Sequence, residues 1–230
     1  MSMHVSIPRN KKGRDFIVGD VHGHFELLLA EMKRAGFNDT QDRLFSVGDI
    51  IDRGPDSLSC LGLLDAPWFH MVRGNHEQMM VDALLGKRWP SWRRNYGRWT
   101  QGMAKSDLKT WAKRLAETPI TMTINQGEFK VGLCHAEPDG RNWKEMRDNP
   151  GSAEPMMWGR RVLHRSKVKP VKGVDITIHG HTPLKKPKWV GNRYFMDTGA
   201  GQGGPLTLRK ISDIYAEYRD FKALNAVFSK

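Results

Sequence analysis

The chain has 230 residues, of which 39% are hydrophobic and 27% are charged, and its formal net charge is +12. These values are typical of one large globular domain, or of one domain with an insertion. No run approaches the ~18 apolar residues that a membrane span needs, and the polar start of the chain has no signal-peptide core. Cys60 and Cys134 are too few for a disulfide framework, so we expect a cytoplasmic protein.

The excess positive charge is concentrated in two segments. One extends from Lys87 to Arg98 and is interleaved with tryptophan and tyrosine, and the other lies between Lys144 and Lys188. Aromatic residues among basic ones can bind single-stranded nucleic acid. A basic surface that attracts anionic substrates explains the same pattern, and we favour this interpretation because any phosphorylated substrate would benefit from it.

Strands and helices alternate in the first part of the chain. The pattern predicts strands at residues 16–19, 44–47 and 68–72, and helices at 25–33, from 55 onward and at 76–85. Such alternation is typical of a parallel sheet. Residues 86–117 interrupt it, because they are basic, rich in tryptophan and helical in pattern, and we expect them to form an insertion or cap.

The second half of the chain predicts a second sheet. We expect its strands at residues 120–124, 129–133, 174–178, 189–190, 194–196, 206–208 and 211–218. Asn125-Gln126-Gly127 between the first two is a hairpin signal. Residues 141–172 are polar and contain proline and glycine, which indicates a long irregular segment on the substrate side.

Side chains that can bind metals follow the predicted strands. Asp20 and His22 come directly after the first strand, and residues two apart in an extended chain point to the same side, so both can hold one cation. Asp49 follows the second strand in the same way. If these strands are neighbours, Asp49 lies beside Asp20 and its oxygens can bridge two metals. Three further candidates, each after a later strand, are Asn75, His135 and His181.

The types of these ligands restrict the metal. Oxygen and imidazole ligands without thiolate suit Mn²⁺, Fe or Zn²⁺ rather than a structural zinc site. Two such ions roughly 3.5–4 Å apart can hold a hydroxide between them and clamp a phosphoryl group for in-line attack. The sequence therefore predicts a phosphoesterase with two divalent metal ions.

Three motifs resemble the signatures of the phosphoprotein phosphatase family of metallophosphoesterases, most closely its phage members. They are Gly19-Asp20-Val21-His22-Gly23, Gly48-Asp49-Ile50-Ile51-Asp52-Arg53-Gly54 and Arg73-Gly74-Asn75-His76-Glu77. Later segments, such as His179-Gly180-His181-Thr182-Pro183, extend the resemblance to about Leu208. The resemblance implies an α/β fold of the calcineurin-like metallophosphoesterase type. In it, a β-sandwich of two mixed sheets is flanked by helices and carries a helical insertion, all in a single domain over residues 1–230.

The resemblance also implies a role for each metal ligand and for an acid. The implied ligands are Asp20, His22 and Asp49 for the first metal, and Asp49, Asn75, His135 and His181 for the second, with Asp49 bridging. His76 would be the general acid that protonates the leaving oxygen, and Asp52 would orient it and stabilise its charged form. The alternative for Asp52 is a salt bridge to Arg53.

Arginines are the implied phosphate ligands, because the planar guanidinium matches phosphate oxygens bidentately. Arg53 is the first of them, and Asn75 lies beside the same phosphate. A second arginine follows Trp158, where we assign Arg160 and keep Arg161 as the alternative. Arg73 is a further candidate, although we favour a role in which it braces the site from behind.

The activity so implied is a Mn²⁺-dependent phosphomonoesterase acting on phosphoserine and phosphothreonine in proteins or peptides, with phosphotyrosine as a further substrate. A dinucleoside polyphosphate hydrolase of the diadenosine tetraphosphatase type remains the alternative, but Asp52-Arg53 and Glu77 favour the protein phosphatase. A nuclease or nucleic-acid-binding relative is disfavoured, because Thr182 stands where many nuclease-type relatives have a second histidine. We expect a monomer without a membrane partner.

Overall fold

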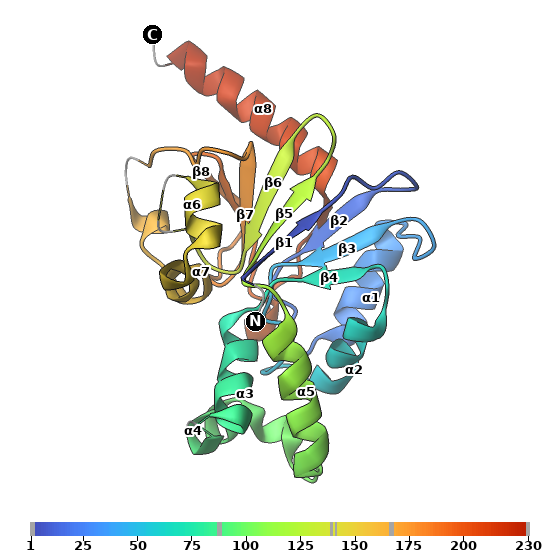
Figure 1. The fold of residues 1–230 in the computed structure, drawn as a ribbon. Coiled ribbons are helices and arrows are strands. Elements are labelled where there is room, and N and C mark those ends of the chain that lie inside the picture. Colours follow the sequence, from blue (N-terminus) through green and yellow to red (C-terminus); the bar gives the residue numbers. More distant parts are fainter. Residues whose placement is uncertain (1–2, 87–88, 139, 141, 166–167, 229–230) are drawn as a thin grey trace.

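The computed structural model of the protein describes residues 3–86, 89–138, 140, 142–165 and 168–228 (Figure 1). Within these ranges, one sheet has six strands in the order β1-β5-β6-β7-β9-β8, and the other has four in the order β10-β2-β3-β4. Both sheets are mixed, and helices flank them on both sides. This is the two-sheet architecture that the sequence predicts.

The first half of the chain forms most of the four-stranded sheet. Its strands are β2 (Asp15–Val18), β3 (Arg43–Ser46), β4 (Phe69–Met71) and β10 (Leu208–Lys210). The strands β2, β3 and β4 are parallel, and β10 is antiparallel to β2. Because β2 and β3 are neighbours, the condition for placing Asp49 beside Asp20 is met.

The six-stranded sheet is formed mainly by the second half. Its strands are β1 (His4–Ile7), β5 (Thr121–Asn125), β6 (Lys130–Cys134), β7 (Ile176–His179), β8 (Lys188–Val190) and β9 (Arg193–Phe195). The pairs β5–β6 and β8–β9 are the predicted hairpins, while β6 and β7 run parallel. The sequence analysis missed β1, which pairs with β5 from a short polar segment.

Three apolar layers hold this sandwich together. The middle layer lies between the sheets and includes Ile17, Phe45, Leu133 and Ile178, all completely buried. The helices that cover the four-stranded sheet are α1 (Phe25–Arg34), α2 (Ser57–Gly62), α3 (Asn75–Leu85) and α5 (Lys105–Glu117). Those that cover the six-stranded sheet are α6 (Trp143–Asp148) and α7 (Ala153–Trp158). The order of layers is therefore helix, sheet, sheet, helix.

Three predictions about the second half are wrong. The strand expected at residues 206–208 of the second sheet is β10, which instead pairs with β2 at the edge of the four-stranded sheet. Residues 211–218 are not a strand but the start of α8 (Ile211–Phe228), in which Ile211, Ile214, Tyr215 and Tyr218 follow the spacing of one helix face and pack against the middle layer. Residues 141–172 are not wholly irregular, because α6 and α7 lie within them. In α8 the helical spacing of the apolar residues outweighs the strand propensity of isoleucine and tyrosine, which the strand prediction followed.

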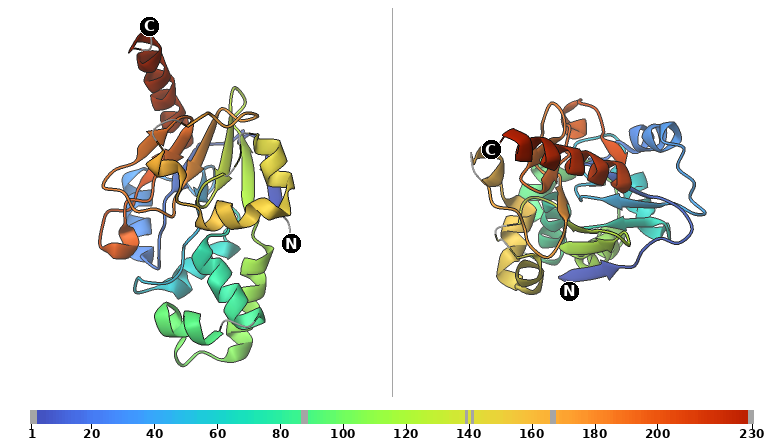
Figure 2. Two further views of the ribbon diagram at one scale, coloured as in Figure 1. Left: turned by 90° about the vertical axis from the view of Figure 1, so that its left-hand side faces the viewer. Right: turned by 90° about the horizontal axis from the view of Figure 1, so that it is seen from above.

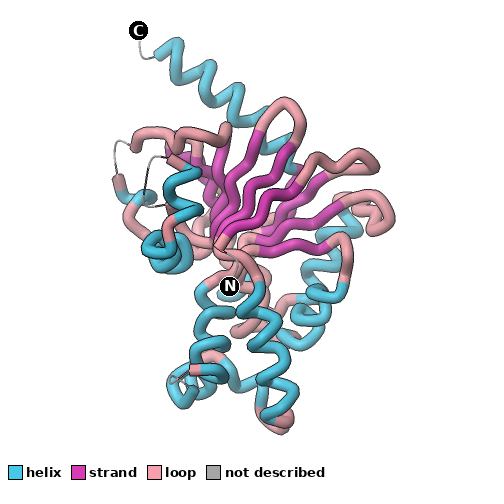
Figure 3. Tube along the Cα trace, viewed as in Figure 1, coloured by secondary structure: helices cyan, strands magenta, loops and turns pink. Residues whose placement is uncertain are grey.

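Most of the segment expected to form an insertion is helical. It contains α4 (Trp89–Asn95), a 3₁₀ turn (Gly97–Thr100) and α5. Figures 2 and 3 show that α3, α4 and α5 gather at one end of the sandwich, whereas α8 projects from the other end. None of the described helices is long and apolar enough to cross a membrane.

A candidate two-metal site between the sheets

The loops that leave the carboxyl ends of parallel strands carry the predicted ligands. The loops after β2, β3 and β4 supply Asp20, His22, Asp49 and Asn75, and those after β6 and β7 supply His135 and His181. All six residues are buried, and none is more than 6% exposed. Since the first four come from one sheet and the last two from the other, the site lies where the two sheets meet.

Four of these side chains converge on one point. Nε2 of His135 lies 2.9 Å from Oδ1 of Asn75 and 3.3 Å from Oδ2 of Asp49. Nδ1 of His181 lies 2.8 Å from the same Asn75 oxygen. The ligand atoms of Asp49, His135 and His181 all fall within 4.8 Å of one another. This is the set of donors assigned to the second metal.

The hydrogen bonds behind the histidines fit a cation in front of them. Nδ1 of His135 lies 2.8 Å from the carbonyl oxygen of Val47, and Nδ1 of His22 lies 3.0 Å from that of Ile51. A carbonyl can only accept, so each Nδ1 carries a hydrogen, and in the neutral ring Nε2 directs its lone pair towards the site. Nε2 of His135 faces oxygens of Asn75 and Asp49, so a cation, either a proton or a metal ion, is needed between it and them. Fixing the ring in this way is typical of metal-bound histidine.

The side chains proposed for the first metal lie farther apart than those proposed for the second. Nε2 of His22 lies 3.7 Å from Oδ2 of Asp49 and 4.0 Å from Oδ2 of Asp20. Both oxygens of Asp20 lie 3.1 Å from the backbone nitrogen of His181, which ties this carboxylate to the loop after β7. The cluster of ligand atoms closest together here is His22, Asp49 and His76. Asp20 lies beside this cluster but is not part of it, and its role as a ligand of the first metal stays a prediction.

The site contains several buried carboxylates, whose negative charge an added positive charge would stabilise. Burial raises the pKa of Asp20 well above its usual range, and the nearby carboxylate of Asp197 raises it further. Burial disfavours a charged His135, but the carboxylates of Asp49 and Asp20 outweigh it and raise the pKa of this histidine to about 10. Burial disfavours a charged Asp49 as well, but His135, His76 and His22 outweigh it and hold the pKa of this carboxylate well below its usual range. The site thus concentrates buried negative charge that nearby positive charge stabilises. Divalent cations would add to this positive charge.

The backbone of the site is held in a strained conformation. Among the described residues, the non-glycine positions with positive φ are His22 (47°), Asp49 (52°), Asp52 (72°), Arg53 (68°) and His181 (69°). Each such residue costs on the order of 1–3 kcal/mol, and such residues cluster at functional sites. All five are candidate site residues, so the strained backbone lies at the predicted site.

Glu77 stabilises these loops, a role that the sequence analysis did not identify. It is completely buried, and its carboxylate accepts the backbone N–H groups of Asp49 (2.8 Å), Ile50 (2.9 Å) and Gly74 (2.9 Å). Its burial raises its pKa to about 7. Glu77 stands three residues after Gly74, the residue before α3, and this capping-box spacing could have identified it.

His76 and Asp52 form a buried pair beside the metal ligands. Nδ1 of His76 lies 2.8 Å from Oδ2 of Asp52, and Nε2 lies 4.0 Å from Oδ2 of Asp49. Nη2 of Arg53 lies 3.2 Å from the same Nε2. These contacts favour the orienting role of Asp52 over a salt bridge with Arg53.

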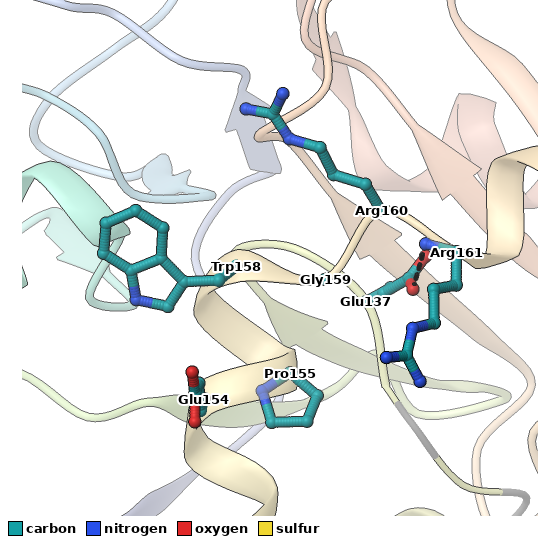
Figure 4. A pocket seen from close by; sticks show the side chains of 7 residues that line it. All are labelled: Glu137, Glu154, Pro155, Trp158, Gly159, Arg160 and Arg161. Atoms are coloured by element: carbon teal, nitrogen blue, oxygen red, sulfur yellow. Dashed lines mark hydrogen bonds between the residues drawn. The ribbon is translucent and has the colours of Figure 1, made fainter.

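Arg160 and Arg161 extend in different directions (Figure 4). Nε of Arg160 donates to Nε2 of His181 at 3.0 Å, whereas the backbone nitrogen of Arg161 donates to Glu137. Both line a cavity of about 590 Å³ together with the half-exposed Trp158. The contact with His181, a candidate metal ligand, favours Arg160 over Arg161 as the candidate phosphate-binding arginine.

Arg73 does not face the convergent ligands. It is 2% exposed, and its guanidinium donates to Gln78 (2.9 Å) and to the carbonyl oxygens of Ala116 (2.6 Å) and Thr118 (2.7 Å). One acceptor lies on α3 and the other two at and just after the end of α5, so the described hydrogen bonds of Arg73 tie these two helices together. Its role as a phosphate ligand stays a prediction. Its position agrees with the bracing role.

Known proteins resemble this chain in sequence and in fold. The model of the calcineurin-like phosphoesterase family matches residues 16–198. Serine/threonine-protein phosphatase 1 of Salmonella typhimurium is 36% identical, over 85% of this chain and 91% of that protein. An asymmetrical bis(5'-nucleosyl)-tetraphosphatase of Anoxybacillus flavithermus is 26% identical, over 86% and 90%.

A solved structure, provisionally described as a diadenosine tetraphosphatase, has a TM-score of 0.68 at 22% identity and covers 92% of this chain and 94% of its own. At that identity it bears on the fold alone. The family model, in contrast, spans most of the chain and includes all six candidate ligands. The chain therefore belongs to the calcineurin-like phosphoesterase family.

Proposed function

We propose that this protein is a two-metal phosphomonoesterase that hydrolyses phosphoserine and phosphothreonine in proteins, with phosphotyrosine as a further substrate. The observation that carries the proposal is the convergence of buried nitrogen and oxygen ligands beside the His76–Asp52 pair. The greater similarity to a serine/threonine-protein phosphatase than to a dinucleoside tetraphosphatase supports this substrate class, at 36% against 26% identity.

The proposed metal ligands keep the roles given above. Asp20, His22 and Asp49 hold one ion, and Asp49, Asn75, His135 and His181 hold the other. When bound, the two ions supply a water-derived nucleophile at neutral pH and offset the charge of the phosphoryl group. Imidazole and oxygen ligands without thiolate suit Mn²⁺, Fe or Zn²⁺. Of these we propose Mn²⁺ as the native metal, as the family resemblance implies.

The remaining residues act on the phosphate ester itself. Arg53 and Arg160 bind phosphate oxygens through charge-assisted hydrogen bonds. As the P–O bond to serine or threonine breaks, Nε2 of His76 gives its proton to the leaving oxygen, while Asp52 holds Nδ1–H and stabilises the charged ring. An alkoxide is a poor leaving group, and a positioned acid is typically worth about 10²–10⁴ in rate.

The basic segment at the start of the insertion fits a peptide substrate better than a nucleic acid. Trp92 is 2% exposed, and its indole N–H, like that of Trp99, donates to Asp52, so the ring of Trp92 offers no free face for base stacking. Arg94 and Arg98 are exposed and would attract acidic phosphopeptides. Lys87 and Arg88 lie outside the described residues. A monomeric state and a cytoplasmic location remain predictions; the two free, buried cysteines suit a reducing compartment.

Product analysis tests this proposal against its nucleotide alternative. The metal-loaded protein is given a phosphoserine peptide and diadenosine tetraphosphate at equal concentrations, and released phosphate and nucleotides are measured by chromatography. We expect higher kcat/KM for the peptide, and strong loss of turnover but not of bound metal in His76→Asn. Preferential cleavage of the dinucleotide would favour the alternative, and hydrolysis of neither would contradict both.

A further inference from the structure

The carboxylate of Asp52 is held by the helical insertion as well as by His76. Oδ1 accepts Nε1–H of Trp99 at 2.7 Å, and Oδ2 accepts Nε1–H of Trp92 at 2.9 Å. With Nδ1 of His76 at 2.8 Å, the fully buried carboxylate has three nitrogen donors. The backbone nitrogen of Asp52 is fixed as well, by Oγ of Ser57 at 2.8 Å.

Two indoles suit the task of fixing a carboxylate. The indole nitrogen can only donate and an ionised carboxylate can only accept, so each contact has one polarity. Trp92 is 2% exposed, and its ring meets that of Trp99 edge to face, with centroids 6.2 Å apart. Because one indole binds each oxygen, the carboxylate cannot rotate away from His76 without breaking both hydrogen bonds.

The same segment also contacts the ring of His76. Tyr96 meets it edge to face with centroids 4.8 Å apart, and His22 meets it in the same manner at 4.7 Å. The imidazole is therefore confined between a metal-ligand histidine and an aromatic residue of the insertion. Residues 92–99 thus contact both members of the His76–Asp52 pair.

We infer that the insertion belongs to the proton-delivery apparatus, with Trp92 and Trp99 as positioning residues that hold Asp52, and through it His76, in line with the leaving oxygen. This inference rests on the proposed phosphatase function. It gives the tryptophan-rich segment a role in the chemical step in addition to any role in substrate choice.

A purely structural role for the indoles would affect stability and the rates on different substrates in another way. If they only anchor the insertion to the body of the protein, their loss lowers stability, or lowers activity towards every substrate to the same extent. If they position the acid, the loss depends on how much the leaving group needs a proton. A nitrophenolate leaves readily without one, whereas a serine alkoxide does not.

The test compares Trp99→Phe with Trp111→Phe. The first variant keeps an aromatic ring but removes the N–H on Asp52, and the second makes the same change on α5, where Trp111 packs against the core and Arg114. For each metal-loaded protein, kcat and KM are measured with 4-nitrophenyl phosphate and with a phosphoserine peptide. His76→Asn gives the full loss of the acid.

We expect Trp99→Phe to lower kcat on the phosphoserine peptide by about 10- to 100-fold, a part of the 10²–10⁴ that a general acid supplies. The rate on 4-nitrophenyl phosphate should change by no more than about threefold, with KM and bound metal retained. In the His76→Asn background the same substitution should have little further effect, because both act on one step. Trp111→Phe should leave the ratio of the two rates unchanged.

Equal losses on both substrates, or a full additional loss in the His76→Asn background, would overturn the inference. If Trp99→Phe does not fold, benzothienylalanine at position 99 replaces the N–H with sulfur in a ring of nearly the same shape and serves as the second variant. A wild-type protein that hydrolyses neither substrate would instead refute the proposed function.

Discussion

Arg160 and Arg161 differ in what their side chains can reach, although they are adjacent in the chain. Only Arg160 contacts a metal-ligand histidine, at 3.0 Å, while Arg161 extends away from it (Figure 4). We expect Arg160→Ala to raise the inhibition constant of inorganic phosphate by about 10- to 100-fold, since a hydrogen bond to a charged group is worth ~1.5–3 kcal/mol.

Arg161→Ala is the matched control and should leave phosphate inhibition within about twofold of the wild type, as is usual for a surface substitution. Both variants are tested by competitive inhibition of 4-nitrophenyl phosphate hydrolysis. A larger effect at Arg161 than at Arg160 would reverse the assignment. The choice between two neighbouring arginines could not be made from sequence, because only the conformation of the loop after α7 separates them.

At the level of secondary structure, the turn after β7 depends on a glycine. The N–H of Gly180 donates to the carbonyl oxygen of His135 at 2.7 Å, and a Cβ added here would overlap Oδ1 of Asp20 and Cγ2 of Val47. Gly180→Ala should therefore displace Asp20 and His181 together, and lower both bound metal and activity while the sheets remain folded.

Metal analysis by mass spectrometry and circular dichroism check this prediction. The control is Gly62→Ala at the end of α2, where an added Cβ meets no heavy atom within 4 Å. That variant should retain metal and gain slightly in stability, by up to about 1 kcal/mol, because glycine in a helix is less favourable than alanine. Full metal content in Gly180→Ala would show that the turn tolerates a side chain.

The secondary structure also explains which features the sequence could predict. The strand–loop–helix pattern predicted the parallel strands and placed the six candidate ligands at their carboxyl ends, because a motif next to a strand is a local signal. The contacts of Asp52 with Trp92 and Trp99 span 40 and 47 residues. Nothing in the sequence indicates that residues so far apart in the chain are in contact. The two tryptophans were therefore noted only as part of a basic segment. The helix α8 was missed because isoleucine and tyrosine at its start also favour a strand.

At the scale of the whole molecule, the candidate site joins the two sheets. His135 and His181 follow strands of one sheet, while Asp20, Asp49 and Asn75 follow strands of the other. Ions that bind only the folded protein stabilise it by about 2.7 kcal/mol at a hundredfold excess over Kd. For a chain of this size we expect removal of metal to lower Tm by about 5–10 °C.

Calorimetry with Mn²⁺ and after chelation measures this shift. His135→Asn is the control, because it lacks a ligand of the second position and should lose part of the difference between the two conditions. An unchanged Tm after complete removal of metal would mean that the sandwich holds its loops in place without ions.

The contacts of Trp92 and Trp99 have an optical consequence. The emission of an indole changes with the charges and paramagnetic ions around it, and these two of the chain's eight tryptophans bind a carboxylate that is one hydrogen bond away from His76. His76 in turn lies 4.0 Å from Asp49, the ligand shared by both proposed ions. We therefore expect the tryptophan fluorescence of the protein to change when the metal site is occupied or when the position of His76 changes.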